Sequence, residues 1–507
     1  MQKIINLIKQ KVPLSQVAIK NIITLLEDGS TIAFIARYRK DLTSNATDEM
    51  LLKFQEVYEY SLKLTKRSEE ILNLLKEKEA LTPKLEELIQ NAQTVTTLED
   101  IYEPFKGVKS SRANDAIKNG LEPLANVMAS MKLSKEDLHV KAKGYLNTNV
   151  KSVEYALKGA MDIVALSYSQ DIKTKESLRN NLENHAVVVT KKSKTFDENG
   201  IYKDLGEISQ KAKFLKSHRI LAILRAQNEK QIGIKIEVDE DYIIDGIKKY
   251  RIPNYANSSK EYVLKAYIDG LKRLLLPSLK RELLANLKQR ASDEAIVLFG
   301  KNLQELLITP PLVNQVILGI DPGFKTGCKL AVIDENGTYL DSSVIYLLND
   351  KQVFDSSKVV LQLIKKYNIS AVAIGNGTAS KESAIFISEL IASNALHVKY
   401  AVVSEIGASI YSASKIAQEE YGFLDVTIRG AISIAQRLRD PMAALVKIDP
   451  KSLGVGQYQH DVNQSDLSKK LNDVTFSLVN KVGVDLNSAS YKLLSFVSGI
   501  SEKSAKN

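Results

Sequence analysis

One stretch, residues 316–334 with the sequence VILGIDPGFKTGCKLAVID, restricts the fold of this chain more than any other. An apolar run at its start ends on Asp321, and turn-forming residues follow at Pro322, Gly323 and Gly327. A second apolar run then leads to the dipeptide Asn336-Gly337, which is typical of hairpin turns. The pattern predicts two antiparallel strands, with Asp321 at the end of a buried first strand.

The carboxylate of Asp321 restricts what such a strand can do. Placing a charge beside a buried strand is costly unless it faces water, a metal ion or a hydrogen-bond partner. RNase H-like nucleases use an acid in this place as a metal ligand, whereas actin-like ATPases and sugar kinases use the following glycine-rich turn to hold phosphate. Asp-Pro-Gly is also ordinary turn chemistry, so a purely structural Asp321 is the third alternative.

Length and periodicity divide the rest of the chain. The 507 residues are long for one domain and predict two to four. Residues 1 to about 310 read mostly as helices, with Ile19, Ile22, Ile23 and Leu26 on one apolar face. Runs of β-branched residues near 186–190 and 233–238 predict a small sheet inserted near 186–245. The Thr309-Pro310-Pro311 segment predicts a linker.

After the linker the pattern changes to strands alternating with helices. The predicted order is β-β-β-α-β-α-β-α, which is that of an RNase H-like fold, a mixed sheet with helices on its faces. Three acids fall at notable places: Asp321 ends one strand, Glu405 follows another, and Asp440 lies on the last helix. A two-metal nuclease needs three or four carboxylates on neighbouring elements to hold Mg²⁺ ions about 4 Å apart, and this spacing is compatible with that.

Composition permits some functions and excludes others. Lys plus Arg is 70 and Asp plus Glu is 60, so the net charge of +10 permits nucleic-acid binding without establishing it. The single cysteine, Cys328, excludes an internal disulfide and a multi-cysteine zinc site, which favours the cytoplasm. No apolar run approaches the roughly 18 residues that span a bilayer, so we expect no membrane partner.

Cations recur in clusters at 106–118, 211–219 and 272–290, and another group follows an apolar half-turn near residue 37. Each cluster alone is typical of a solvated helix face, but three of them favour a shared basic surface. The candidate nucleic-acid-binding residues are Arg37, Arg39, Lys40, Lys106, Lys109, Arg112, Lys216, Arg219, Lys272 and Arg273.

Several motifs together resemble one known family. They are 34–40 (FIARYRK), 98–105 (LEDIYEPF), 217–219 (SHR), 318–327 (LGIDPGFKTG), 374–380 (IGNGTAS), Ser404-Glu405 with 407–409 (GAS), 429–431 (RGA) and 447–461 (KIDPKSLGVGQYQHD). With these motifs the chain resembles the Tex family of bacterial transcription accessory proteins. The resemblance covers nearly the whole chain, and the last motif is the most specific.

The resemblance implies a multidomain chain: a mainly α N-terminal region at 1–311, an α/β RNase H-like (YqgF) domain at 312–446, and a short α segment at 447–507. The last segment resembles the opening of a helix-hairpin-helix motif, with Ser498-Gly499-Ile500 as the hairpin. The resemblance also implies further helix-hairpin-helix structure and an OB-type RNA-binding domain, and neither follows within this sequence.

The expected function is that of a cytoplasmic, nucleic-acid-binding transcription accessory protein. Its partners would be RNA and/or DNA together with the transcription machinery, and its YqgF domain would serve mainly as a scaffold. The main alternative is an Mg²⁺-dependent, RuvC-like nuclease using Asp321, Glu405 and Asp440 as catalytic and metal-binding residues. Lys325 lies in the turn beside Asp321, where a cation competes with a metal or binds phosphate. A further alternative function is that of an ATP-using domain of the actin-like or sugar-kinase type. The sequence lacks a convincing second phosphate loop for that function.

Overall fold

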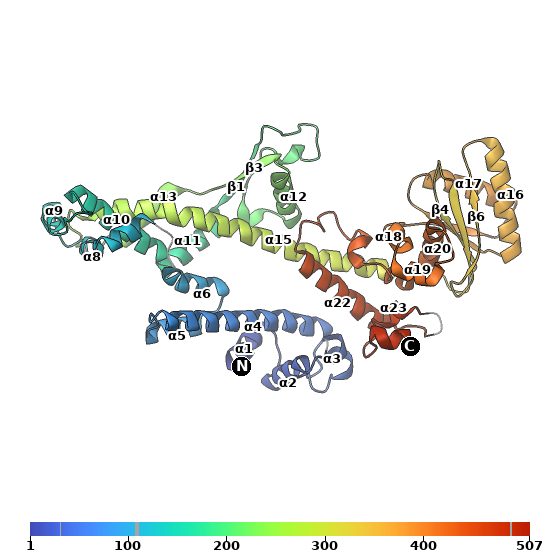
Figure 1. Cartoon of the computed structure of the whole chain (residues 1–507), viewed down its shortest axis with the longest axis horizontal. Helices are drawn as coiled ribbons and strands as arrows, with labels where there is room; N and C mark the ends of the chain where they lie inside the picture. The colour runs from blue at the N-terminus through green and yellow to red at the C-terminus, as the bar shows by residue number, and fades with distance from the viewer. Residues whose placement is uncertain (31, 107–110, 487–488) are drawn as a thin grey trace. The chain divides into compact units, whose positions relative to one another are not determined.

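The computed structural model describes residues 1–30, 32–106, 111–486 and 489–507 (Figure 1). The chain forms two compact units, Met1–Ala291 and Ser292–Asn507. They are called the first and the second unit below. Helix α15 (Leu276–Leu307) begins in the first unit and ends in the second.

The first unit is mainly helical, as predicted. Its helices before α15 are α1 (Gln2–Lys11), α2 (Gln16–Glu27), α3 (Ile32–Tyr38), α4 (Asp48–Glu77), α5 (Pro83–Asn91), α6 (Val95–Tyr102), α7 (Arg112–Lys118), α8 (Glu122–Ala129), α9 (Lys135–Lys143), α10 (Val153–Gln170), α11 (Ile172–His185), α12 (Ser217–Asn228), α13 (Glu240–Arg251) and α14 (Lys260–Asp269).

Local sequence signals explain how these helices begin and which face they bury. At the start of α2, the side chain of Ser15 accepts a hydrogen bond from the Ala18 N–H and so satisfies a free backbone donor. The predicted apolar face then packs inward, because Ile19, Ile22 and Ile23 are buried in the N-terminal core.

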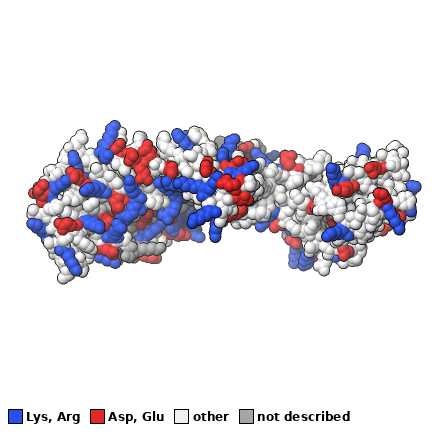
Figure 2. All heavy atoms as spheres, turned by 90° about the horizontal axis from the view of Figure 1, so that it is seen from above, with Lys and Arg blue, Asp and Glu red and all other residues white. Residues whose placement is uncertain are grey.

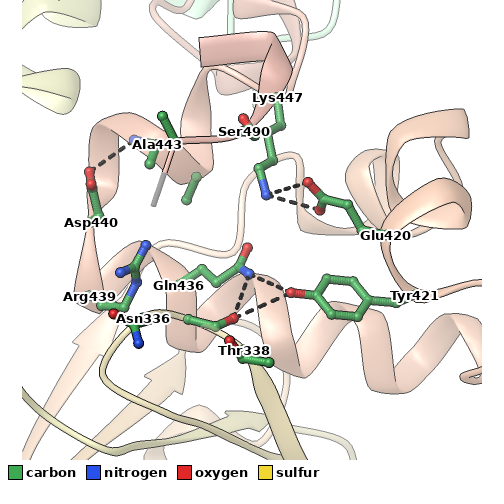
Figure 3. A pocket seen from close by; sticks show the side chains of 13 residues that line it. Asn336, Thr338, Glu420, Tyr421, Gln436, Arg439, Asp440, Ala443, Lys447 and Ser490 are labelled. Carbon is green, nitrogen blue, oxygen red and sulfur yellow. Dashed lines mark hydrogen bonds and ion pairs between the residues drawn. The ribbon is translucent and has the colours of Figure 1, made fainter. Parts of the chain in front are cut away.

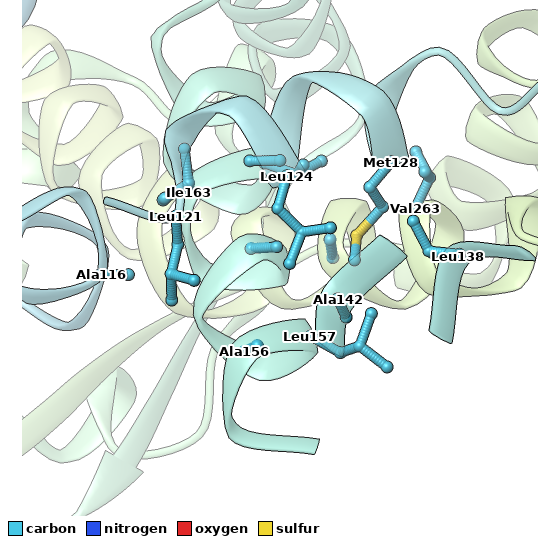
Figure 4. Close-up of a cluster of buried hydrophobic side chains, with 14 of the residues drawn as sticks. Ala116, Leu121, Leu124, Met128, Leu138, Ala142, Ala156, Leu157, Ile163 and Val263 are labelled. Atoms are coloured by element: carbon cyan, nitrogen blue, oxygen red, sulfur yellow. The ribbon is translucent and has the colours of Figure 1, made fainter. Parts of the chain in front are cut away.

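A second core joins helices α7 to α10 and α14, and Figure 4 shows its side chains. Leu121, Leu124, Met128 and Val263 are fully buried there. Helix α10 packs closely because it carries small residues. A Cβ added at Gly159 would lie 2.5 Å from Leu121 Cδ1, so this position accepts no larger residue without a shift.

The 98–105 motif forms a buried ion network inside the first unit. Asp100, on α6, is 7% exposed and is bound by two cations of α11. Lys175 Nζ lies 3.2 Å from Asp100 Oδ1, and Arg179 Nη1 lies 2.7 Å from Asp100 Oδ2. Arg179 also bonds Glu282 of α15 at 2.5 Å. The motif therefore ties the N-terminal helices to α11 and α15.

The first unit also contains the predicted small sheet. Its strands are β1 (Val187–Lys192), β2 (Ser209–Lys211) and β3 (Ile232–Glu237), in the antiparallel order β2-β1-β3. Strands β1 and β3 lie where β-branched residues predicted them. Strand β2 was not predicted, because it is only three residues long and its sequence, SQK, contains no apolar residue.

The second unit contains a five-stranded mixed sheet in the order β6-β5-β4-β7-β8. Its strands are β4 (Ile317–Asp321), β5 (Cys328–Ile333), β6 (Tyr339–Ile345), β7 (Ala371–Gly375) and β8 (Lys399–Val403). Its main helices are α16 (Asp350–Tyr367), α17 (Ser380–Ser393), α18 (Ala408–Ser412), α19 (Lys415–Tyr421), α20 (Val426–Arg439) and α21 (Pro441–Leu445). The predicted element order is confirmed.

Helices cover both faces of this sheet (Figure 1). One core lies between the sheet and helices α16 and α17, and the other lies between the sheet and α20. The contact of α20 with β4 is unusually close. A Cβ added at Gly319 would lie 2.2 Å from the Ala431 carbonyl oxygen, so only glycine lets the strand and the helix approach this far.

The C-terminal segment folds as short helices against a longer one. These are α22 (Gln464–Val482), α23 (Tyr491–Leu494) and α24 (Glu502–Lys506). Asn480 of α22 donates to the Phe496 carbonyl at 2.8 Å and accepts from the Ser498 N–H at 2.9 Å, which docks the hairpin on α22. Across the described ranges, no helix is both long enough and apolar enough to cross a bilayer.

Candidate functional site

Asp321 lies at the end of β4, as predicted, with its side chain only partly exposed. Burial and, to a smaller extent, the negative charge of Glu405 raise the pKa of this carboxyl to about 6. The cation that opposes this rise is Lys329, which lies directly opposite Asp321 in the β4–β5 register. Asp321 is therefore an acid that is partly protonated near neutral pH.

Glu405, just after β8, is the second predicted acid, and the structure brings it to Asp321. Its backbone N–H donates to the Asn376 side chain at 3.0 Å. The glycine-rich turn after β7 makes room for its carboxylate. A Cβ at Gly377 would lie 2.0 Å from Glu405 Oε1, and one at Gly375 would lie 2.9 Å from Oε2. The glycine-rich turn at 374–380 thus encloses a carboxylate.

Helix α20 faces this pair with its backbone. A Cβ at Gly430 would lie 2.8 Å from Asp321 Oδ2, so the helix position nearest Asp321 carries no side chain. The side chain of Lys329 donates to the backbone carbonyls of Gly327, at 2.9 Å, and Thr326. Lys325, the cation predicted beside Asp321, is exposed in the same turn.

Arg437 of α20 is a functional candidate that the sequence did not suggest. It is buried, and its Nη1 donates to the Ser404 carbonyl at 2.6 Å. Burial lowers the pKa of Arg437 to about 10, and the charge of Glu405 opposes that change. The sequence signal that could have indicated its burial is its position three residues after Ile434, on the same face of the helix.

Asp440, the third predicted acid, lies among the residues that line a separate pocket, shown in Figure 3. It follows Gly430 by ten residues, which is about 15 Å along a helix. It caps α21, because Asp440 Oδ1 accepts from the Ala443 N–H at 2.9 Å. It lines a cavity of about 330 Å³ with Glu420 and Lys447, which form an ion pair at 2.8 Å. Neither Asp321 nor Glu405 lines this cavity.

The chemistry available at the carboxylate pair follows from this geometry. Among the described residues, no group of three His, Cys, Asp or Glu side chains could hold a metal ion. Two carboxylates fit one Mg²⁺, which is commonly bound through one or two carboxylates, waters and substrate phosphates. They do not supply the ligand set of a two-metal clamp. Without a metal, Asp321 can hold a proton near neutral pH, because burial and the nearby negative charge of Glu405 disfavour its ionised form.

The ten candidate nucleic-acid-binding residues fall into three groups. Five are exposed and have no ion pair within the described chain: Arg39, Lys40, Arg112, Lys216 and Arg219. Three are held by acids, Lys106 by Glu99, Lys272 by Glu240, and Arg273 by Asp269 and Asp162. Lys109 and the side chain of Arg37 lie outside the described part of the structure.

Two of the basic clusters meet in the first unit. Arg290, at the end of the 272–290 cluster, donates through Nη2 to the Leu215 carbonyl of the 211–219 cluster at 3.1 Å. Figure 2 shows Lys and Arg side chains over much of the first unit, at the left of the view, with Asp and Glu side chains between them. The charge is therefore local to such clusters rather than one continuous band on this face.

Strand order, the helices on both faces and the acid at the end of β4 define the second unit as containing an RNase H-like α/β domain. Four family models match the chain: the Tex-like protein N-terminal domain at 2–76, the Tex central region at 134–299, the Tex protein YqgF-like domain at 315–439, and a helix-hairpin-helix motif at 479–507.

Relatives from distant organisms agree with these matches. The chain is 38% identical over 508 residues to the protein YdcI of Bacillus subtilis, covering 99% of this chain and 70% of that protein. It is 38% identical over 522 residues to the transcriptional accessory protein Tex of Neisseria gonorrhoeae, covering 99% and 67%. It is 34% identical over 512 residues to the human S1 RNA-binding domain-containing protein 1, covering 96% and 50%. The chain belongs to the Tex family.

Proposed function

We propose that this chain is a nucleic-acid-binding transcription accessory protein whose YqgF domain serves as a scaffold. The main support for the scaffold role is the placement of the three predicted acids. Asp321 and Glu405 lie together, whereas Asp440 caps α21. The position of α20 nearest to Asp321 is Gly430. A two-metal nuclease would need a further carboxylate there.

The names of relatives support the binding role. One is a transcriptional accessory protein and another is named for an S1 RNA-binding domain. The exposed cations of the first unit supply the charge that such a role needs, because phosphate neutralisation provides most of non-specific affinity. We further propose RNA and/or DNA and the transcription machinery as partners and the cytoplasm as location, in keeping with the buried, free thiol of Cys328.

The domain limits 1–311, 312–446 and 447–507 are part of the same proposal. The second candidate function is a nuclease that uses one Mg²⁺ at Asp321 and Glu405. The raised pKa of Asp321 favours it, since a bound cation would relieve the repulsion between the two carboxylates. In that case Asp321 and Glu405 would hold the ion, and the ion would polarise a phosphate oxygen of the substrate.

Metal titration with nucleic acid separates the two functions. The protein, Asp321→Asn and Asp440→Asn are incubated with labelled single-stranded, duplex and branched substrates over a range of Mg²⁺ and Mn²⁺. Asp440→Asn is the matched control, because it removes an acid of the same unit that lies apart from the pair. A scaffold predicts binding by all three proteins and no cleavage. Metal-dependent cleavage that only Asp321→Asn abolishes would overturn the scaffold role.

A further inference from the structure

The segment between β2 and α12 lies at the surface of the first unit, and buried side chains and hydrogen bonds hold its backbone. Ala212 and Leu215 are 1% and 4% exposed and anchor the segment in the core. The Ala212 N–H donates to the Ala186 carbonyl at 2.9 Å, and the Gln210 side chain donates to the Phe214 carbonyl at 3.2 Å. The exposed side chains of Lys211, Lys213 and Phe214 therefore project from an anchored backbone.

Phe214 points out of this segment into solvent. It is 64% exposed, although the apolar residues on either side of it, Ala212 and Leu215, are buried. Burying a phenylalanine is worth about 1.5–3 kcal/mol, so the exposed ring forgoes that stabilisation. Single exposed hydrophobic residues are common and need no explanation by themselves. What sets Phe214 apart is the charge around it.

The residues around Phe214 are cationic. Residues 211–219 contain four cations, one histidine and no acid. Arg290 joins them from α15 through its bond to the Leu215 carbonyl. Lys213 bonds only a neutral partner in the described chain, the Asn184 side chain at 3.1 Å. This contrasts with Lys272 and Arg273, which acids hold.

We propose that these residues form a binding surface for single-stranded nucleic acid, which we call the Phe214 surface. It consists of Lys211, Lys213, Phe214, Lys216, Arg219 and Arg290. An unpaired base stacks on the Phe214 ring, and the flanking phosphates contact the cations. A ring among cations is the arrangement by which proteins bind single strands without sequence preference, because every unpaired base has a face to stack.

The choice of a single strand follows from the ring. In a duplex the faces of the bases are covered by their neighbours, so an aromatic side chain gains nothing there, whereas the cations contact phosphates of either form. An acidic protein segment would bind the cations but would not stack a base on the Phe214 ring. The inference rests on the proposed function and adds where, and to which form, the chain binds.

The test measures binding of the full chain and its variants to labelled oligouridine, oligodeoxythymidine and a duplex of the same length. Phe214→Ala is expected to weaken single-strand binding about tenfold and to leave duplex binding unchanged. Phe354→Ala is the matched control, because Phe354 is 62% exposed but lies on α16 in the second unit. It should change neither affinity.

A second variant, Lys216→Ala with Arg219→Ala, tests the charge. It should weaken both forms and reduce the slope of log affinity against log salt by roughly 1.4 for single strands, about 0.7 for each lost phosphate contact. Circular dichroism checks that each variant stays folded, which the exposed positions favour.

The outcomes separate the inference from the function it rests on. If the unmodified chain binds no nucleic acid even at low salt, the proposed function fails. If it binds but Phe214→Ala binds equally well, or loses duplex and single-strand affinity alike, only the Phe214 surface is wrong. Binding of polyglutamate that Phe214→Ala weakens, with nucleic-acid binding unchanged, would overturn it in favour of a protein partner.

Discussion

Asp100 in the first unit and Asp321 in the second are both partly or fully buried carboxyl groups, but the charges around them are opposite in sign. Asp100 is bound by two cations, Lys175 and Arg179. Asp321 faces another acid, Glu405, and the cation that opposes the rise of its pKa, Lys329, also bonds backbone carbonyls. Cations therefore balance the charge of Asp100, whose role is structural. Within the described residues, Asp321 lacks such a pair of cations and can bind a proton or a cation.

The comparison shows why an acid in a family motif does not by itself indicate chemistry. The 98–105 and 318–327 motifs both belong to the resemblance, and they contain Asp100 and Asp321 respectively. Only the surroundings distinguish them, since two cations bind the carboxylate of Asp100, whereas burial and the like charge of Glu405 raise the pKa of Asp321. Substitutions that change the surroundings of either acid therefore test that distinction.

The largest effect is expected from removing a partner of Asp100. Arg179→Met leaves a buried charge with less compensation and should destabilise the first unit by about 3–5 kcal/mol. Urea unfolding followed by hydrogen exchange in α6 and α11 measures this unit separately. Adding Asp100→Asn to Arg179→Met should restore part of the loss. If Arg179→Met alone is as stable as the unmodified chain, Asp100 is not held as described.

A smaller effect is expected from crowding Glu405. Gly377→Ala places a Cβ 2.0 Å from the present position of Glu405 Oε1, so the carboxylate must move. We expect a loss of about 1–3 kcal/mol in the second unit. We also expect the pKa of Asp321 to fall, because the like charge moves away.

Carbon-13 NMR of the Asp321 carboxyl follows that pKa directly. Gly246→Ala on α13 is the control, since a Cβ there meets no atom within 4 Å, and alanine should favour that helix. An unchanged pKa of Asp321 in Gly377→Ala would contradict the coupling to Glu405.

The smallest effect concerns pH. The pKa of Asp321 is about 6 in the folded chain, above its ordinary value of 3.8, so the folded state binds the proton more tightly than the unfolded state. Above pH 6 the ionised carboxyl destabilises the second unit, and this destabilisation is lost as the pH falls from 6 to 4. Asp321→Asn should therefore be more stable than the unmodified chain at pH 8, by about 1 kcal/mol because solvent screens a partly exposed acid.

Denaturation of both proteins at pH 8 and pH 4 checks this, with hydrogen exchange in β4 as the readout. The difference should be absent at pH 4. A stability difference that is the same at both pH values would mean that Asp321 does not titrate in this range.

Sequence patterns predicted the second unit well because its strands are short apolar runs separated by clear turns. They could not predict which cation faces Asp321. That depends on strand register, which pairs Asp321 with Lys329 rather than placing Lys325 beside it. The prediction that Asp440 lies on the last helix is wrong, because α20 ends at Arg439 and Asp440 caps the start of α21. Glycines at 319 and 430 fix which end of α20 meets β4, and that is a tertiary property.

The close contact between Gly319 and Ala431 has a consequence for how the protein is made. The two residues are 112 positions apart, so closing this loop costs roughly 4 kcal/mol of chain entropy before the contact forms. At ordinary translation rates of about 5–20 residues per second, α20 leaves the ribosome roughly 5–20 s after β4. During that time one face of the apolar strand β4 lacks its covering helix. We expect the nascent second unit to be a chaperone client until α20 docks.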